Sequence, residues 1–81
     1  MKIIKKDGNY VLFINQSTSV ELERKTEFRL RDIVQIGTVY YQVVNVFDSH
    51  NSVLPNGEAK YVLDQMSAEN LIEMAYSVIK I

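Results

Sequence analysis

The clearest pattern of hydrophobic and polar residues lies between Asp32 and Val46, and it predicts a β-hairpin. Two runs rich in Ile, Val and Tyr flank Gly37-Thr38, and a Gly-X pair in a two-residue loop is typical of a type II′ turn. The turn sets the register, with Ile36 opposite Val39. Extended in that register, one face of the hairpin carries nearly all the large apolar residues, namely Phe28, Leu30, Val34, Ile36, Val39, Tyr41, Val43 and Phe47.

A second hairpin is predicted at the N-terminus. Asp7-Gly8 is a type I′ turn signal, and closing the loop there pairs Lys6 with Asn9. One face then consists of Met1, Ile3, Tyr10, Leu12 and Ile14. The opposite face mixes lysines with Ile4, Val11 and Phe13, so we expect this hairpin to be partly covered on both sides or to lie at a crossing between packed sheets.

Three further strands are expected. Spacing of two between apolar residues predicts strands at 20–24, 27–31 and 59–65. Asp32 interrupts the apolar face of the central hairpin, and because an unpaired carboxylate is unfavourable in a core, we expect a bend there that redirects the side chain. The stretches 15–19 and 48–58 are rich in turn-forming residues and are predicted to be loops.

The apolar spacing becomes helical near the C-terminus. Ser67 is a favourable N-cap, and Ala68, Leu71, Ile72 and Ala75 follow a helical period. This pattern predicts a helix over 68–77. Residues 78–81 either extend the helix or form a strand at an edge of the sheet. We therefore expect a single α+β domain over 1–81: a small, strongly curled antiparallel sheet or SH3-like barrel of five to six strands with one C-terminal helix.

Composition narrows the functional classes. The 81 residues are 47% hydrophobic and 23% charged, with a net charge of −1 and no cysteine, which is typical of a soluble globular domain. The absence of cysteine excludes disulfides, thiolate zinc sites and a cysteine nucleophile. No apolar run is long enough to span a membrane, and the N-terminus does not resemble a signal peptide, so we expect a cytoplasmic protein without a membrane partner.

The sequence offers little for catalysis. His50 is the only histidine, and common catalytic and phosphate-binding motifs are absent. Asp48, His50 and Asn51 are close in sequence but supply too few ligands for a recognisable metal site. Glu21, Glu23 and Asp32 would supply a carboxylate pair for acid–base catalysis only if the fold brought them together, and the alternation of a strand explains Glu21 and Glu23 without any chemistry. We therefore predict a protein that is not an enzyme and has no cofactor and no metal.

The outward face of the central hairpin is the candidate binding site. The register that buries Val34 and Tyr41 places polar and basic side chains together on the other side, with Ile33 and Val46 nearby. Tyrosine and arginine are enriched at interface hot spots. The chain's own helix or N-terminal hairpin could also cover the apolar part of this face. The predicted site consists of Arg29, Arg31, Gln35, Tyr40, Gln42 and Val44.

The leading functional hypothesis is a protein–protein interaction module that binds a partner or a second copy of itself. Small size and a Lys-, Asn- and Ile-rich composition suggest an inhibitor or accessory protein of phage or mobile-element origin. One alternative is a small nucleic-acid-binding barrel that uses Arg29, Arg31 and Tyr40, which the acidic pI of 5.7 disfavours. Another alternative is a small-ligand binder with the 48–58 loop as a lid.

Overall fold

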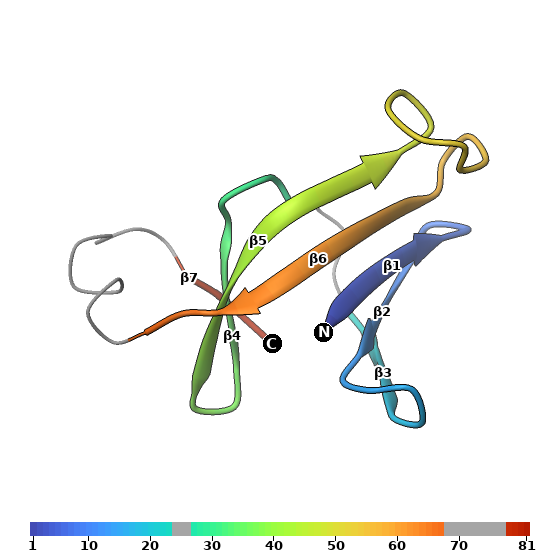
Figure 1. The fold of residues 1–81 in the computed structure, drawn as a ribbon. Helices are drawn as coiled ribbons and strands as arrows, with labels where there is room; N and C mark the ends of the chain where they lie inside the picture. The colour runs from blue at the N-terminus through green and yellow to red at the C-terminus, as the bar shows by residue number, and fades with distance from the viewer. Residues whose placement is uncertain (24–26, 68–77) are drawn as a thin grey trace.

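The chain forms one curled β-sheet. The structure, a computed structural model, describes residues 1–23, 27–67 and 78–81. These residues contain seven strands in the spatial order β3-β2-β1-β6-β5-β4-β7, and the sheet curls into a half-barrel (Figure 1). Neighbouring strands are antiparallel except β4 and β7, which are parallel. The strands are β1 (Lys2–Lys6), β2 (Asn9–Phe13), β3 (Ser19–Leu22), β4 (Ile33–Ile36), β5 (Val39–Asp48), β6 (Ala59–Gln65) and β7 (Val78–Lys80).

The predicted α+β class with a C-terminal helix is wrong. The described residues form an all-strand architecture without a helix, and the span of the predicted helix, 68–77, lies outside them. A small, strongly curled sheet is confirmed, although it has seven strands and one parallel pair where five to six antiparallel strands were expected. Of the two endings that the sequence left open, the strand is present as β7.

The N-terminal hairpin has the predicted register. Lys6 pairs with Asn9, and the two turn residues have the positive φ that a type I′ turn requires at both central positions, 53° for Asp7 and 78° for Gly8. Asparagine, aspartate and glycine tolerate this conformation with little strain. The local turn chemistry therefore fixes which side chains of β1 and β2 point inward.

The central hairpin also has the predicted register near its turn. Ile36 pairs with Val39 and Val34 with Tyr41, and Gly37 has a φ of 63°, as the first position of a type II′ turn requires. The predicted pairing stops before Leu30, where a turn interrupts the strand.

That turn spans residues 29–32 and contains the bend expected at Asp32. The Arg29 amide donates to Asp32 Oδ2 at 2.8 Å and the Asp32 amide donates to the Arg29 carbonyl at 3.1 Å, while Arg31 has a φ of 75°. The strand predicted at 27–31 is therefore absent. Phe28 still reaches the core, whereas Leu30 is 54% exposed, because the turn breaks the alternation between them.

A β-bulge changes the facing of the second half of β5. The pairing with β6 shifts between Val43 and Asn45, so one extra residue is inserted and the alternation restarts. Val46 packs against the core. Phe47 pairs with Lys60, a neighbour of buried Tyr61, and so lies on the opposite face. The prediction that Phe47 shares a face with Val43 is wrong for this reason.

The core lies on the concave, inner face of the half-barrel. Tyr10, Phe28 and Tyr61 form an aromatic cluster with ring centroids 5.4 to 6.2 Å apart, in the range where aromatic pairs attract. Apolar residues from β1 to β6 complete the core, namely Ile3, Leu12, Leu22, Val34, Val43, Ala59 and Leu63. Ile33 and Met66 are also buried but do not belong to this cluster.

Candidate functional site

Part of the predicted binding face is assembled as expected. Gln35 and Tyr40 pair across β4 and β5, and Gln42 pairs with Ile33 on the same strands. By the alternation of side chains these residues lie on the outer face, opposite the core. The register that was predicted from the Gly37 turn is the reason that they lie together.

The arginines and Val44 lie at the far end of the same hairpin. Arg31, Gln42 and Val44 line a shallow hollow of about 220 Å³, and Gln42 Nε2 donates to the Arg31 carbonyl at 3.4 Å. Val44 is 40% exposed because it occupies the bulge. Arg29 is exposed in the turn that precedes β4. Whether this face binds a partner stays a prediction.

Ile33 shows that the chain itself covers part of this face. Its side chain is 2% exposed although it lies opposite Val34 and away from the main core. Val46, the other apolar residue assigned to this face, packs against the inner core because of the bulge. The apolar surface that motivated the original hypothesis is therefore reduced to Val44.

A second site, which the sequence reading missed, lies where the two edges of the sheet approach each other. β3 and β7 are the end strands in the sheet order, and both line a groove of about 320 Å³. We call this groove the seam. Its lining consists of Val20, Glu21, Leu22, Glu23, Ile79, Lys80 and Ile81.

The seam is too wide for the two edge strands to pair directly. No Cα atom of β3 lies within 8 Å of a Cα atom of β7, whereas paired strands lie roughly 4.8 Å apart. One additional strand between them would need a separation of about 9.6 Å, twice that spacing. The two described edges therefore lack the direct pairing that would close the sheet and exclude an additional strand.

The inner side chains at the seam are incompletely buried. Val20 pairs with Leu12, and Ile79 with Val34, so both belong to the inner row of the half-barrel. Nevertheless Val20 is 45% exposed, and Ile81, which continues the row of Ile79, is 42% exposed. The core of the half-barrel thus reaches solvent along this line.

Among the described residues, the backbone of β3 has no strand partner on the side of the seam. Lys6 and Asn9 flank a two-residue turn and therefore form a hydrogen-bonded pair. Along β1 and β2 from this pair, hydrogen-bonded and non-hydrogen-bonded residue pairs alternate. Tyr10 and Leu12 therefore direct their backbone groups toward Leu22 and Val20 of β3. By the same alternation Ser19 and Glu21 direct their backbone groups away from β2, into the seam.

The backbone of β7 is arranged in a similar way. The Ile81 amide donates to the Gln35 carbonyl at 2.9 Å, so the alternate residues Ile79 and Ile81 face β4, and Val78 and Lys80 face the seam. Counting directions around the sheet, β3 and β7 run in opposite senses. A strand inserted between them would be antiparallel to one edge and parallel to the other.

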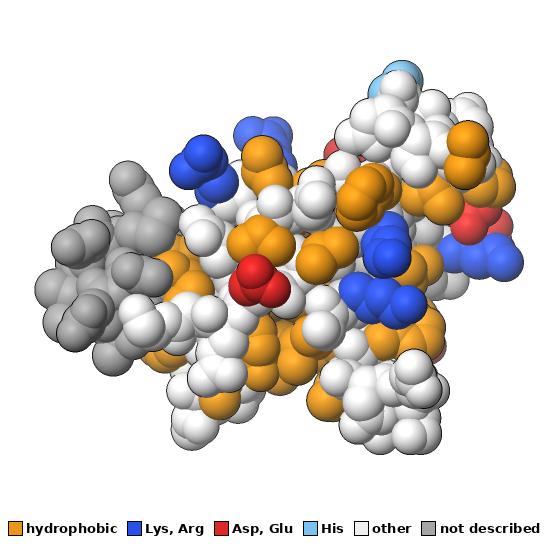
Figure 2. Space-filling model, viewed as in Figure 1, with side chains coloured by type: hydrophobic (Ala, Val, Ile, Leu, Met, Phe, Trp, Pro, Cys, Tyr) orange, Lys and Arg blue, Asp and Glu red, His pale blue; other side chains and the backbone are white. Residues whose placement is uncertain are grey.

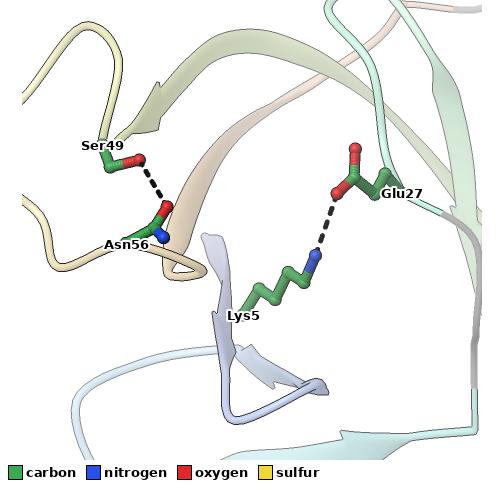
Figure 3. A network of polar contacts seen from close by, with 4 residues as sticks. All are labelled: Lys5, Glu27, Ser49 and Asn56. Atoms are coloured by element: carbon green, nitrogen blue, oxygen red, sulfur yellow. Dashed lines mark hydrogen bonds and ion pairs between the residues drawn. The ribbon is translucent and has the colours of Figure 1, made fainter.

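A separate polar cluster lies beside the long loop between β5 and β6 (Figure 3). Lys5 Nζ lies 2.9 Å from Glu27 Oε1, and Ser49 donates to Asn56 Oδ1 at 3.4 Å across the loop. The Glu27 carboxylate is the largest cause of a raised Lys5 pKa. The ion pair joins β1 to the segment before Phe28, and the Ser49–Asn56 hydrogen bond links two parts of the loop.

The residues that had been considered for a metal site shape this loop. Asp48 Oδ1 accepts hydrogen bonds from the amides of His50 and Asn51, and Asn51 Oδ1 accepts one from the Asp48 amide. Within the described part of the chain no group of three or more His, Cys, Asp or Glu residues could hold a metal ion. A hollow of about 290 Å³ lies between the loop and Lys5.

Comparison with protein-family models, with curated proteins and with solved structures finds no match. Among the residues that the structure describes, no helix is long and apolar enough to cross a membrane. The functional argument therefore rests on the geometry of this chain.

Proposed function

We propose that the chain is a non-enzymatic protein-interaction module that binds an extended segment of a partner protein at the seam. The observation that carries this proposal is that, among the described residues, the two end strands of the sheet line one groove without pairing with each other. Addition of a strand to a free sheet edge is a common mode of peptide recognition, in which main-chain hydrogen bonds supply affinity.

The chemistry of the seam supports this mode of binding. A partner strand would bond to the backbone groups of Glu21 and Lys80 and would place alternate side chains over Val20, Ile79 and Ile81. Soluble proteins usually protect free edges with charged residues, prolines or bulges. Here the inner position at the middle of β3 is an exposed valine, which favours pairing.

The proposed binding surface differs from the one that the sequence predicts. The face first predicted from the sequence lies on the outer side of β4 and β5, whereas the seam lies between β3 and β7. A role as an inhibitor or accessory protein of phage or mobile-element origin stays a prediction from size and composition.

A selection from a displayed library of ten-residue linear peptides tests the function. We expect selected peptides to bind in an extended form with a dissociation constant in the micromolar range. Val20→Lys places a charge on the edge and should weaken binding at least tenfold. Val53→Lys is the matched control, because Val53 is fully exposed in the distant loop and should bind like wild type.

One result would contradict the proposal, and a second measurement identifies the occupant of the seam. A selection that yields no peptide whose binding depends on Val20 contradicts the proposal. Light scattering from 5 to 500 µM shows whether a second copy of the chain occupies the seam. In that case the wild type is dimeric and Val20→Lys is monomeric, while Val53→Lys remains dimeric.

A further inference from the structure

The outer face of the sheet carries two pairs of lysine and phenylalanine that the seam does not use. Lys2 pairs with Phe13 across β1 and β2, with Nζ 5.6 Å from the ring centroid. Lys60 pairs with Phe47 across β6 and β5, with Nζ 5.9 Å from the ring centroid. Both rings are partly exposed. We call these four residues the lysine–phenylalanine face.

A hollow of about 510 Å³ adjoins one of these pairs. Its described lining combines four apolar residues with two lysines and two amides and contains no acidic residue, namely Met1, Lys2, Phe13, Ile14, Asn15, Gln16, Lys60 and Val62. Figure 2 shows hydrophobic side chains over β5, β6 and β1 with basic side chains beside them. The lining is therefore locally positive although the whole chain has a net charge of −1.

The β2–β3 loop gives this hollow a defined wall. Asn15 Oδ1 accepts hydrogen bonds from the amides of Ser17 and Thr18, both at 2.9 Å. These bonds hold the loop in a tight turn. The exposed Gln16 also lines the hollow, and its side-chain amide offers both a donor and an acceptor to a bound molecule.

We propose that the lysine–phenylalanine face binds single-stranded nucleic acid, with one base in the hollow against Phe13 and the backbone along Lys2 and Lys60. Aromatic rings on a positively charged sheet face stack bases without sequence preference, and lysines neutralise phosphates. A base that stacks on Phe13 displaces Lys2 from the ring, and the phosphate then becomes the new partner of the ammonium group.

The register sets the extent of this site. Phe13 and Phe47 lie on β2 and β5, which are three strand spacings apart in the sheet order, or about 14 Å. A chain that contacts both rings must cross β1 and β6 and pass Lys2 and Lys60. Glu21, paired with Val11, and Asp64, paired with Gln42, lie at the margins of this path. The site therefore fits a short oligonucleotide of several nucleotides.

This site differs from the nucleic-acid alternative predicted from the sequence. That alternative used Arg29, Arg31 and Tyr40, of which the arginines lie before β4 or in its preceding turn and Tyr40 lies on β5. The new site uses β1, β2, β5 and β6 and is also separate from the seam. Its success or failure therefore does not depend on the protein-interaction proposal.

Fluorescence anisotropy with a labelled eight-residue oligothymidylate tests this inference. Two neutralised phosphates give a slope of log Kd against log salt concentration of about 1.4, so affinity should fall about sevenfold between 50 and 200 mM salt. Phe13→Leu keeps the apolar volume but removes the ring, and should weaken binding about fivefold or more.

Charge variants separate specific binding from general attraction. Lys60→Gln should lower the salt slope by about 0.7, and Lys60→Arg should restore it. Lys80→Gln is the matched control, because Lys80 lies on β7 outside the hollow, and it should bind like wild type. Circular dichroism confirms that each variant is folded.

Four results would overturn the inference. The first is an absence of saturable binding at 25 mM salt. The second is equal binding by wild type and the folded Phe13→Leu and Lys60→Gln variants. The third is a loss of affinity in Lys80→Gln as large as in Lys60→Gln, which would indicate charge attraction without a site. Binding of double-stranded DNA with equal affinity would exclude stacking and would also count against the proposal.

Discussion

The middle of the sheet and its edges bury their inner side chains to very different extents. Val43 in β5 is 0% exposed, whereas Val20 in edge strand β3 is 45% exposed. Both are valines that point to the same side of one curled sheet. The difference arises because β5 has a strand on each side and β3 has one on only one side. Burial in this fold therefore depends on a residue's place in the sheet order as much as on its type.

This contrast identifies the seam as the place where the described sheet is not closed and its inner side chains remain exposed. In the middle, the inner row is closed by the aromatic cluster of Tyr10, Phe28 and Tyr61. At the edges, exposed apolar side chains occur beside backbone groups that pair with no described strand. An additional strand would supply both the missing hydrogen bonds and the missing apolar contacts, which is the physical basis of the proposed function.

The largest expected effect is a difference between two identical substitutions. Val43→Ala removes fully buried methyl groups and should lower the free energy of unfolding by about 2 kcal/mol or more. Val20→Ala at the seam should lower it by less than ~1 kcal/mol, because much of the side chain is already in solvent. Urea unfolding followed by circular dichroism measures both, and equal losses would contradict the distinction between middle and edge.

The sequence predicted the local parts of this comparison. Asp7-Gly8 and Gly37-Thr38 each define a two-residue turn, and a turn determines the register of the strands that it joins. This is why the inner residues of the N-terminal hairpin and the shared face of Gln35, Tyr40 and Gln42 were predicted correctly. Both predictions depend on residues a few positions apart.

The incorrect predictions depend on long-range contacts or on subtle local changes. No residue type marks the bulge at Val44, so the facing of Phe47 could not be deduced from alternation. Asp32 indicated a bend, but no residue indicated that the turn begins at Arg29. Leu30 was therefore wrongly assigned to the core.

The seam could not be predicted either. The pairing of β7 with β4 joins segments more than 40 residues apart and determines which strands are edges. A sequence pattern shows that a strand has an apolar side, but it does not show whether a second neighbour covers that side. For the same reason Val20 was assigned to a half-buried strand without any indication that it lies beside a groove.

A second effect comes from an ionisable group in the middle of the sheet. Tyr61 is 3% exposed, and burial is the largest cause of a raised pKa for its hydroxyl. The neutral form is favoured in the folded chain, so stability is full below the unfolded pKa of about 10 and falls as pH rises above it.

The expected slope is about 1.4 kcal/mol of unfolding free energy per pH unit above pH 10. Tyr61→Phe should remove this part of the slope, and the difference between the two proteins excludes other groups that titrate in the same range. Urea unfolding between pH 8 and 11 provides the measurement. Parallel pH profiles for wild type and variant would show that burial of this hydroxyl does not disfavour its ionised form.

A third, smaller effect concerns the turn at residues 29–32, which precedes β4. Asp32→Ala removes the acceptor of the Arg29 amide hydrogen bond and should lower the free energy of unfolding by about 1 to 1.5 kcal/mol. Asp64→Ala is the control, since Asp64 is an exposed residue of a regular strand, and it should change stability by less than ~0.5 kcal/mol. Equal effects in urea unfolding would remove the assigned role of Asp32.

The smallest effect is expected at the surface ion pair beside the long loop. The Glu27 side chain is 70% exposed, and exposed ion pairs contribute little because water and salt screen them. Glu27→Gln should change the free energy of unfolding by less than ~0.5 kcal/mol in 150 mM salt. A loss above 1 kcal/mol would mean that this contact, and not the burial of Phe28, holds the segment against the sheet.

Native-state amide hydrogen exchange of the free chain tests the central claim most directly. If the seam is open, the amide of Glu21 faces solvent while the amides of its neighbours Val20 and Leu22 bond to β2. The account predicts that Glu21 exchanges at least tenfold faster than either neighbour, after correction for intrinsic rates. Protection of Glu21 equal to that of Val20 and Leu22 would show that the edge of β3 is already paired, and would contradict the proposed site.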